Sequence, residues 1–148
     1  MFVCIRLIEA LIANGLKYLV LCPGSRSGPL AMAAGGLAES YNLNLITAID
    51  ERSAAFLALG ISTASGKAAA VITTSGSAVG NLLPAAIEAD RSCQPLLFLT
   101  ADRPERLKNC GANQTVNQEE FLRSVCRSVE EGPSKGLHLC SEFELKKL

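Results

Sequence analysis

The sequence predicts an α/β domain built on a doubly wound parallel sheet with helices on both faces. Short apolar segments recur along the chain, and each is too brief for a helix and is bounded by turn residues. Segments of helical length separate them, and apolar strands that alternate with helices are typical of a parallel sheet covered on both faces. The 148 residues, of which 49% are hydrophobic, fit one domain with a buried core.

The elements are expected to alternate in a regular order. The strands are predicted at residues 18–21, 43–49, 68–73 and 94–100. The helices are predicted before residue 15 and at residues 29–38, 51–65, 77–89 and 119–127. In the first helix Leu7, Leu11 and Ile12 share one face, and Asn14-Gly15 provides a left-handed cap. Pro84 lies inside the predicted helix 77–89.

A long polar segment, residues 102–120, follows the last predicted strand. Connections of this length within a compact domain are uncommon and usually serve a function. The domain itself is predicted to span residues 1–131. Residues 132–148 are expected to be a tail or the start of a linker, in which residues 137–139 could begin a last strand.

Composition limits the kinds of partner that the chain is expected to bind. Fourteen basic and 14 acidic residues cancel to a formal charge of zero, so neither a nucleic acid nor an anionic membrane is expected as a partner. The six cysteines form no Cys-x-x-Cys pair and His138 is the only histidine, so no metal site is expected. The partner is therefore expected to be a small molecule or another protein surface.

Two familiar nucleotide-binding motifs fail on spacing. Gly60 and Gly66-Lys67 imitate a P-loop, but five residues separate the glycines, and Ala68 stands where a magnesium-binding hydroxyl is needed. Gly24 and Gly28 lack the third glycine of a dinucleotide-binding turn. A nicotinamide or flavin cofactor is therefore disfavoured.

The first candidate ligand loop follows the first predicted strand and reads Cys22-Pro23-Gly24-Ser25-Arg26-Ser27. It places a tight turn, hydroxyls and one guanidinium at a helix amino terminus, where free amides and the helix dipole favour an anion. A carboxylate or a phosphate is the expected ligand. In the alternative reading Ser27 caps the helix and Arg26 is solvated.

Two further loops carry an acid and a glycine turn. Asp50-Glu51-Arg52 opens a helix, and we expect Asp50 to cap it while Glu51 faces a ligand; the alternative is that Glu51 only complements the helix dipole. In the turn Thr74-Ser75-Gly76-Ser77 the glycine would let the backbone approach a flat ring closely. Asn81 follows one helical turn later.

A fourth segment completes the pattern with Ala101-Asp102-Arg103-Pro104 and Cys110-Gly111-Ala112-Asn113-Gln114-Thr115. With the three loops above, it resembles the amino-terminal pyrimidine-binding domain of the SEPHCHC synthase family, thiamine-diphosphate enzymes of menaquinone and phylloquinone biosynthesis. The resemblance covers nearly all of residues 1–131. It is greatest to the cyanobacterial and plastid members, which implies a bacterial cytoplasm or a plastid stroma as the location.

The resemblance implies roles for particular residues and a reaction. Glu51 is the expected catalytic residue, because the family's glutamate hydrogen-bonds the aminopyrimidine ring and activates the cofactor. The reaction joins 2-oxoglutarate to isochorismate with loss of carbon dioxide. The cofactor-binding residues implied are Glu51, Thr74, Ser75, Gly76 and Asn81, and the substrate-binding residues are Ser25, Arg26, Arg103, Asn113 and Gln114. For Arg103 the alternative is a surface salt bridge with Asp102 or Glu105.

The chain departs from this family in one respect. Family members are several times longer, and a carboxyl-terminal domain holds the diphosphate and magnesium (or manganese) through a Gly-Asp-Gly type of motif. The aspartates here are Asp50, Asp90 and Asp102, and none precedes a glycine. We therefore expect half of an active site, inactive alone and completed by a homo-oligomer or a companion chain, whether the chain is a fragment, a truncated product or part of a split enzyme. The alternatives are an acetolactate synthase-like carboligase and a non-catalytic interaction domain.

Overall fold

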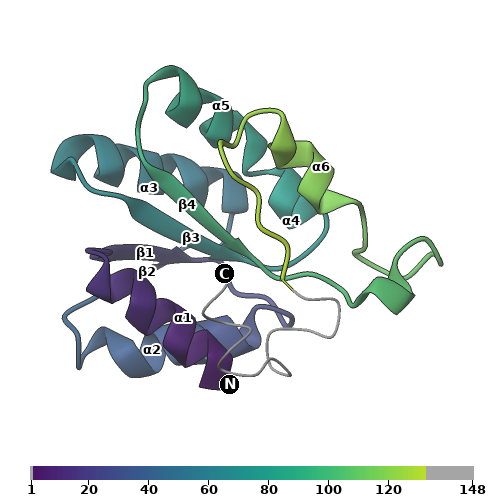
Figure 1. The fold of residues 1–148 in the computed structure, drawn as a ribbon, viewed down its shortest axis with the longest axis horizontal. Coiled ribbons are helices and arrows are strands. Elements are labelled where there is room, and N and C mark those ends of the chain that lie inside the picture. Colours follow the sequence, from purple (N-terminus) through teal and green to yellow (C-terminus); the bar gives the residue numbers. More distant parts are fainter. Residues whose placement is uncertain (1, 133–148) are drawn as a thin grey trace.

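The computed structural model describes residues 2–132 and contains one parallel sheet (Figure 1). Its strands are β1 (Tyr18–Leu21), β2 (Asn44–Thr47), β3 (Ala69–Thr73) and β4 (Leu96–Thr100). They lie in the order β2-β1-β3-β4, and every neighbouring pair is parallel. The predicted parallel sheet is confirmed. β2 is shorter than predicted, because its pairing with β1 ends at Thr47, and Ile49 beyond it is 88% exposed.

Helices cover both faces of the sheet, as predicted for a doubly wound fold. One face carries α1 (Phe2–Ala13) and α2 (Gly28–Ala38) (Figure 1). The other carries α3 (Glu51–Ser65), α4 (Ser77–Gly80), α5 (Leu83–Arg91) and α6 (Gln118–Arg123). A short 3₁₀ turn, η1 (Glu105–Leu107), lies in the long polar segment. No helix among residues 2–132 is both long and apolar enough to cross a membrane.

The core consists of two hydrophobic layers separated by the sheet. Neighbouring strand residues point to opposite faces, so Leu19 packs with α1 and α2 while Val20 packs with α3 and α5. All residues of β3 are buried because this strand is central and covered on both sides. Alanines 54, 55 and 58 of α3 are fully buried, so this helix lies close against the sheet. The central strands β1 and β3 therefore provide the buried residues of the sheet, whereas no residue of the edge strands β2 and β4 is fully buried.

The predicted helix 77–89 is wrong as a single element, because it is broken into α4 and α5. Pro84 lacks a backbone N–H, and its ring would collide with the carbonyl of Gly80 in a continuous helix. The chain turns at Asn81-Leu82, and Pro84 sits in the first turn of α5, where it is tolerated. The break leaves a one-turn helix directly after Gly76.

Helix ends follow the local signals closely. α1 ends at Ala13, Gly15 beyond it has φ +97°, and the amide of Leu16 donates to the carbonyl of Leu11, so the predicted left-handed cap is confirmed. α6 ends at Arg123, earlier than predicted, and the amides of Val125 and Cys126 both turn back to the carbonyl of Leu122. The predicted strand at residues 137–139 lies outside the described residues. The domain limits stay a prediction.

Candidate functional site

Loops from all the strands meet at the carboxyl edge of the sheet. Parallel strands end at the same edge, and open α/β sheets bind ligands there. The loop after β1 carries Arg26, α3 after β2 begins with Glu51, and the turn after β3 contains Gly76. The segment after β4 returns over this edge and places Gln114 on Gly76. Residues far apart in sequence thus form one cluster.

Asp50 and Glu51 have different partners at the start of α3. The Asp50 side chain accepts a hydrogen bond from the Ser53 amide at 2.7 Å, so the predicted cap is confirmed. Hydrogen bonding to Ser53 holds the pKa of Asp50 below its ordinary value. Among residues 2–132, the Glu51 carboxylate accepts a single long contact, 3.4 Å, from the side-chain amide of Asn81. The half-buried Glu51 carboxylate therefore keeps hydrogen-bonding capacity for a ligand.

A buried thiol lies close to these two acids. Cys22 follows β1 and is 1% exposed. Burial raises its pKa to about 11, and the charges of Glu51 and Asp50 add to the shift. Because the thiol stays protonated at neutral pH, Cys22 contributes apolar packing rather than a nucleophile.

The turn after β3 is crowded by two other loops. Gly76 is buried with φ +80° and ψ −136°, and a Cβ there would lie 2.8 Å from Cγ of Gln114. A Cβ on Gly24 would lie 2.5 Å from Cβ of Thr74. The side of Gly76 that a Cβ would occupy is thus covered by Gln114 and is not open for a flat ring. The hydroxyls of Thr73 and Thr74 are buried without a hydrogen-bond partner in the described part of the chain, which is unusual for buried polar groups and favours a polar ligand.

Two guanidinium groups converge on one backbone carbonyl. Arg26 donates to the side-chain oxygen of Gln114 at 2.6 Å and to the carbonyl of Asn113 at 3.3 Å. Arg103 donates to the same carbonyl at 3.0 Å. The alternative of a merely solvated Arg26 is therefore wrong. Ser25, another predicted substrate residue, is exposed beside Arg26.

The other structural alternatives for these loops also fail. Ser27 does not cap α2, because its backbone is helical and its hydroxyl instead donates to the carbonyl of Gly24 at 3.1 Å. Arg103 forms no salt bridge with Asp102 or Glu105 among the described contacts, because both carboxylates pair with the ammonium of Lys108 instead. Arg103 donates to Asn113 instead, and its buried Nε has no partner within residues 2–132.

Lys108 is a structural residue that the sequence did not reveal. Its ammonium lies 3.0 Å from Glu119 and 3.1 Å from Asp102, and its side chain is 11% exposed. Burial alone would lower the pKa of Lys108, but hydrogen bonds and charges from Glu119 and Asp102 raise it. Burial would raise the pKa of Glu119, whereas hydrogen bonds from the backbone and Lys108, with the charges of Lys108 and Arg123, lower it. The lysine thus ties the segment after β4 to α6.

Lys108→Met is expected to lower the free energy of unfolding at pH 7 by about 1–3 kcal/mol, between the values for exposed and buried ion pairs. The pKa of Glu119 is depressed in the folded state. The stabilisation is therefore present above the ordinary value of 4.5 and is lost as the pH falls through the folded pKa. Urea unfolding from pH 7 to pH 3 measures the effect, with the exposed Lys67→Met as control. A difference between parent and variant that does not shrink as the pH falls contradicts this account.

Gln118 is a second residue that sequence reasoning missed. Its side-chain oxygen accepts from the amide of Gly76 at 3.0 Å, and its side-chain nitrogen donates to the carbonyl of Ala101 at 2.8 Å. Only 4% of the residue is exposed. In the sequence it is one polar residue in a polar run, and no local pattern marks it.

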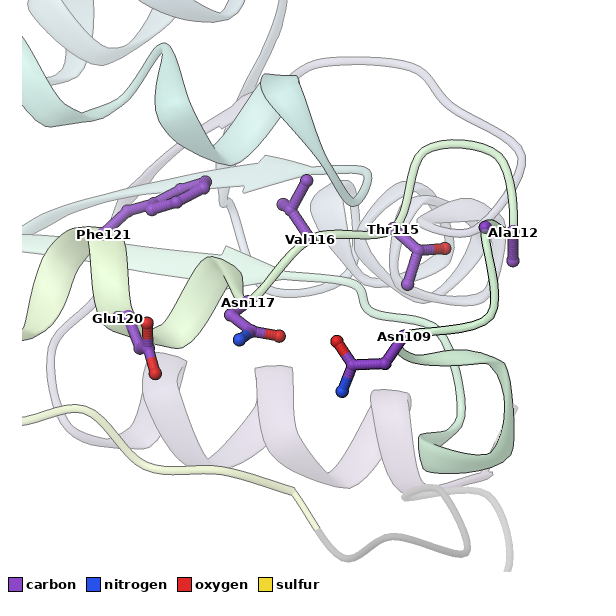
Figure 2. A pocket seen from close by; sticks show the side chains of 8 residues that line it. Asn109, Ala112, Thr115, Val116, Asn117, Glu120 and Phe121 are labelled. Atoms are coloured by element: carbon purple, nitrogen blue, oxygen red, sulfur yellow. The ribbon is translucent and has the colours of Figure 1, made fainter.

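A separate hollow of about 430 Å³ lies beside this cluster. Figure 2 shows that its side chains come from α6 and the loop before it. They include Asn109, Thr115, Val116, Asn117, Glu120 and Phe121. It contains none of the predicted site residues. Among residues 2–132 no group of three or more His, Cys, Asp or Glu residues could hold a metal ion.

The fold and the loops at its carboxyl edge define an α/β domain of the kind that thiamine enzymes use to bind their cofactor. Residues 4–121 match the family model described as thiamine pyrophosphate enzyme, N-terminal TPP binding domain. The chain therefore belongs to this family, and thiamine pyrophosphate is the same compound as thiamine diphosphate.

Its relatives carry a more specific name, 2-succinyl-5-enolpyruvyl-6-hydroxy-3-cyclohexene-1-carboxylate synthase, which is SEPHCHC synthase. The protein of Prochlorococcus marinus strain NATL1A is 67% identical over 99% of this chain, and that of strain MIT 9313 is 74% identical over 89%. The protein of Synechococcus sp. strain CC9605 is 72% identical over 89% of the chain. The match covers 25%, 23% and 24% of these relatives, so the chain spans about a quarter of their length. The resemblance read from the motifs is confirmed.

Proposed function

We propose that the chain provides the pyrimidine-binding half of the active site of a thiamine-diphosphate-dependent SEPHCHC synthase. The reaction joins 2-oxoglutarate and isochorismate with decarboxylation, in menaquinone or phylloquinone biosynthesis. The observation that carries this proposal is the convergence of Arg26 and Arg103 on Asn113, beside the turn that contains Gly76. Both substrates carry two carboxylates, and guanidinium groups bind carboxylates in charge-assisted pairs.

The residues present fit the pyrimidine end of the cofactor. Thr74 offers a buried hydroxyl with no partner among the described residues, and Glu51 offers a carboxylate that only Asn81 contacts. Glu51, Thr74 and Asn81 would therefore hold the aminopyrimidine, whereas Ser75 and Gly76, which already bond Gln114 and Gln118, would shape the turn beside it. When bound, thiamine diphosphate supplies a nucleophilic carbon for decarboxylation and carbon–carbon bond formation.

This chain's residues orient the reactants and hold a proton. Glu51 holds a proton on its carboxylate for the cofactor ring, and Asn81 orients that carboxylate. Arg26 and Arg103 bind the substrate carboxylates, with Ser25, Asn113 and Gln114 as neutral hydrogen-bonding groups. The diphosphate and its magnesium or manganese ion belong to parts of the enzyme that the relatives carry in addition. The working enzyme is a homo-oligomer or a complex with a companion chain, and the cyanobacterial relatives favour a bacterial cytoplasm over a plastid stroma.

A hybrid enzyme tests this proposal. In it the present chain replaces the matching quarter of the Prochlorococcus marinus strain NATL1A relative, to which it is 67% identical. The hybrid is expected to form the product from 2-oxoglutarate and isochorismate, detected by mass spectrometry, whereas the chain alone is expected to be inactive and to bind thiamine diphosphate weakly or not at all. A folded hybrid without activity contradicts the proposal.

Substituting the two arginines separates this function from its closest rival. Arg26→Gln and Arg103→Gln in the hybrid are each expected to raise the KM of at least one dicarboxylate by ten- to a hundredfold, because each charge-assisted hydrogen bond is worth about 1.5–3 kcal/mol. Arg52→Gln, an exposed arginine on α3, is the control. An acetolactate synthase-like carboligase would not depend on these arginines for dicarboxylates. A non-catalytic interaction domain would give no active hybrid.

A further inference from the structure

Outside the proposed ligand contacts, the Gln118 side chain is buried and hydrogen-bonded at both of its polar atoms. It lies at the start of α6 and reaches back to two elements that the proposed function uses. Its oxygen accepts from the Gly76 amide, in the turn assigned to the cofactor. Its nitrogen donates to the carbonyl of Ala101, two residues before Arg103.

Both partners of Gln118 need this side chain. The Gly76 amide is buried, and a buried donor left without an acceptor is costly. An amide side chain carries an acceptor and a donor on the same carbon and in one plane, so one uncharged group can bond both partners. Gln118 therefore keeps the β3–α4 turn and the end of β4 at a set separation.

A second hydrogen bond holds the segment that contains Gln114 against the turn after β3. Four residues before Gln118, the carbonyl of Gln114 accepts from the Ser75 hydroxyl at 2.8 Å. Gln114 itself has φ +57°, a strained conformation for a residue with a side chain, so its position depends on the contacts around it. Ser75 and Gln118 thus hold both ends of a short segment over Gly76.

We infer that Gln118 is a positioning residue that couples the cofactor turn to the substrate-binding residues Arg103 and Gln114. The expected effect of Gln118 on the reaction rests on the proposed function. Its geometry rests on hydrogen bonds at both ends of one buried side chain. In the proposed site Gln118 contacts neither the cofactor nor a substrate. It acts by holding the Gly76 amide and the Ala101 carbonyl in place.

The first test uses the 148-residue chain alone and needs no activity. Gln118→Met keeps the length of the side chain but removes both hydrogen bonds, so amide exchange at Gly76 is expected to become roughly tenfold faster or more. Gln118→Glu keeps the acceptor and is expected to restore most of the protection. Gln94→Met, at the opposite end of β4, is the matched control. Unchanged exchange at Gly76 in a folded Gln118→Met variant overturns the inference.

The second test uses the hybrid enzyme and separates positioning from plain stability. Gln118→Met is expected to raise the KM of a dicarboxylate substrate about tenfold, while kcat at saturating substrate and cofactor changes less than about threefold. A lower melting temperature with an unchanged KM overturns the inference and leaves the proposed function intact. An inactive parent hybrid contradicts the proposed function, and the exchange experiment still decides the role of Gln118.

Discussion

Glu51→Gln in the hybrid enzyme is expected to reduce kcat by two to four orders of magnitude, the usual range for a positioned proton-transfer group. The substitution keeps the size of the side chain and a hydrogen-bonding oxygen for Asn81. It removes the ability to hold and share a proton with the cofactor ring. Steady-state rates at saturating thiamine diphosphate and substrates measure the effect.

Two controls accompany the Glu51 variant. Asp50→Asn changes the neighbouring acid, which caps α3 through the Ser53 amide, and it is expected to leave kcat within about threefold, since asparagine is also a good cap. The melting temperature of Glu51→Gln should match that of the parent. A Glu51→Gln hybrid that keeps full activity would remove Glu51 from catalysis and support an interaction domain.

Gly76→Ala is expected to produce the second large effect, on stability and activity together. Its φ of +80° with ψ of −136° is essentially restricted to glycine, and the new Cβ would lie 2.8 Å from Cγ of Gln114. Backbone strain and overpacking together should lower the free energy of unfolding by roughly 3 kcal/mol or more. Displacing Gln114 also breaks its contact with Arg26, so activity of the hybrid should fall about a hundredfold.

Gly66→Ala provides the matched control for Gly76. Gly66 also has a positive φ, +65°, at the end of α3, but no atom lies within 4 Å of its added Cβ. Its variant should lose only about 1 kcal/mol, the cost of a left-handed alanine, and keep full activity. Urea unfolding and hybrid turnover compare the two variants. Equal effects at both positions would show that strain alone, and not the contact with Gln114, explains the role of Gly76.

Several features of the site followed directly from the sequence. Asp50 as cap, Glu51 as the first residue of α3 and the glycine turn after β3 are local signals, since each depends on residues within one helical turn. The roles of these residues toward cofactor and substrate stay predictions.

Other features of the site could not be predicted from the sequence, because they depend on contacts between distant segments. Arg26 and Gln114 are 88 positions apart, and their hydrogen bond depends on the path of the loop after β4. Lys108 and Gln118 lie in a polar run without periodicity, so nothing local distinguishes them from solvated residues. The break at Asn81-Leu82 was missed although Pro84 signals it, because the apolar pattern continues through it.

The sequence by itself determined the fold class, the succession of strands and helices along the chain, and the caps at Gly15 and Asp50, because apolar periodicity and capping depend on neighbouring residues. Only the tertiary structure decided which loops meet at the carboxyl edge of the sheet. There, the close approach to Gly76 and the hydrogen bonds of Arg26, Lys108 and Gln118 determine how the segment after β4 lies. These contacts join residues far apart in the chain, so they exist only after the sheet has brought its strand ends together.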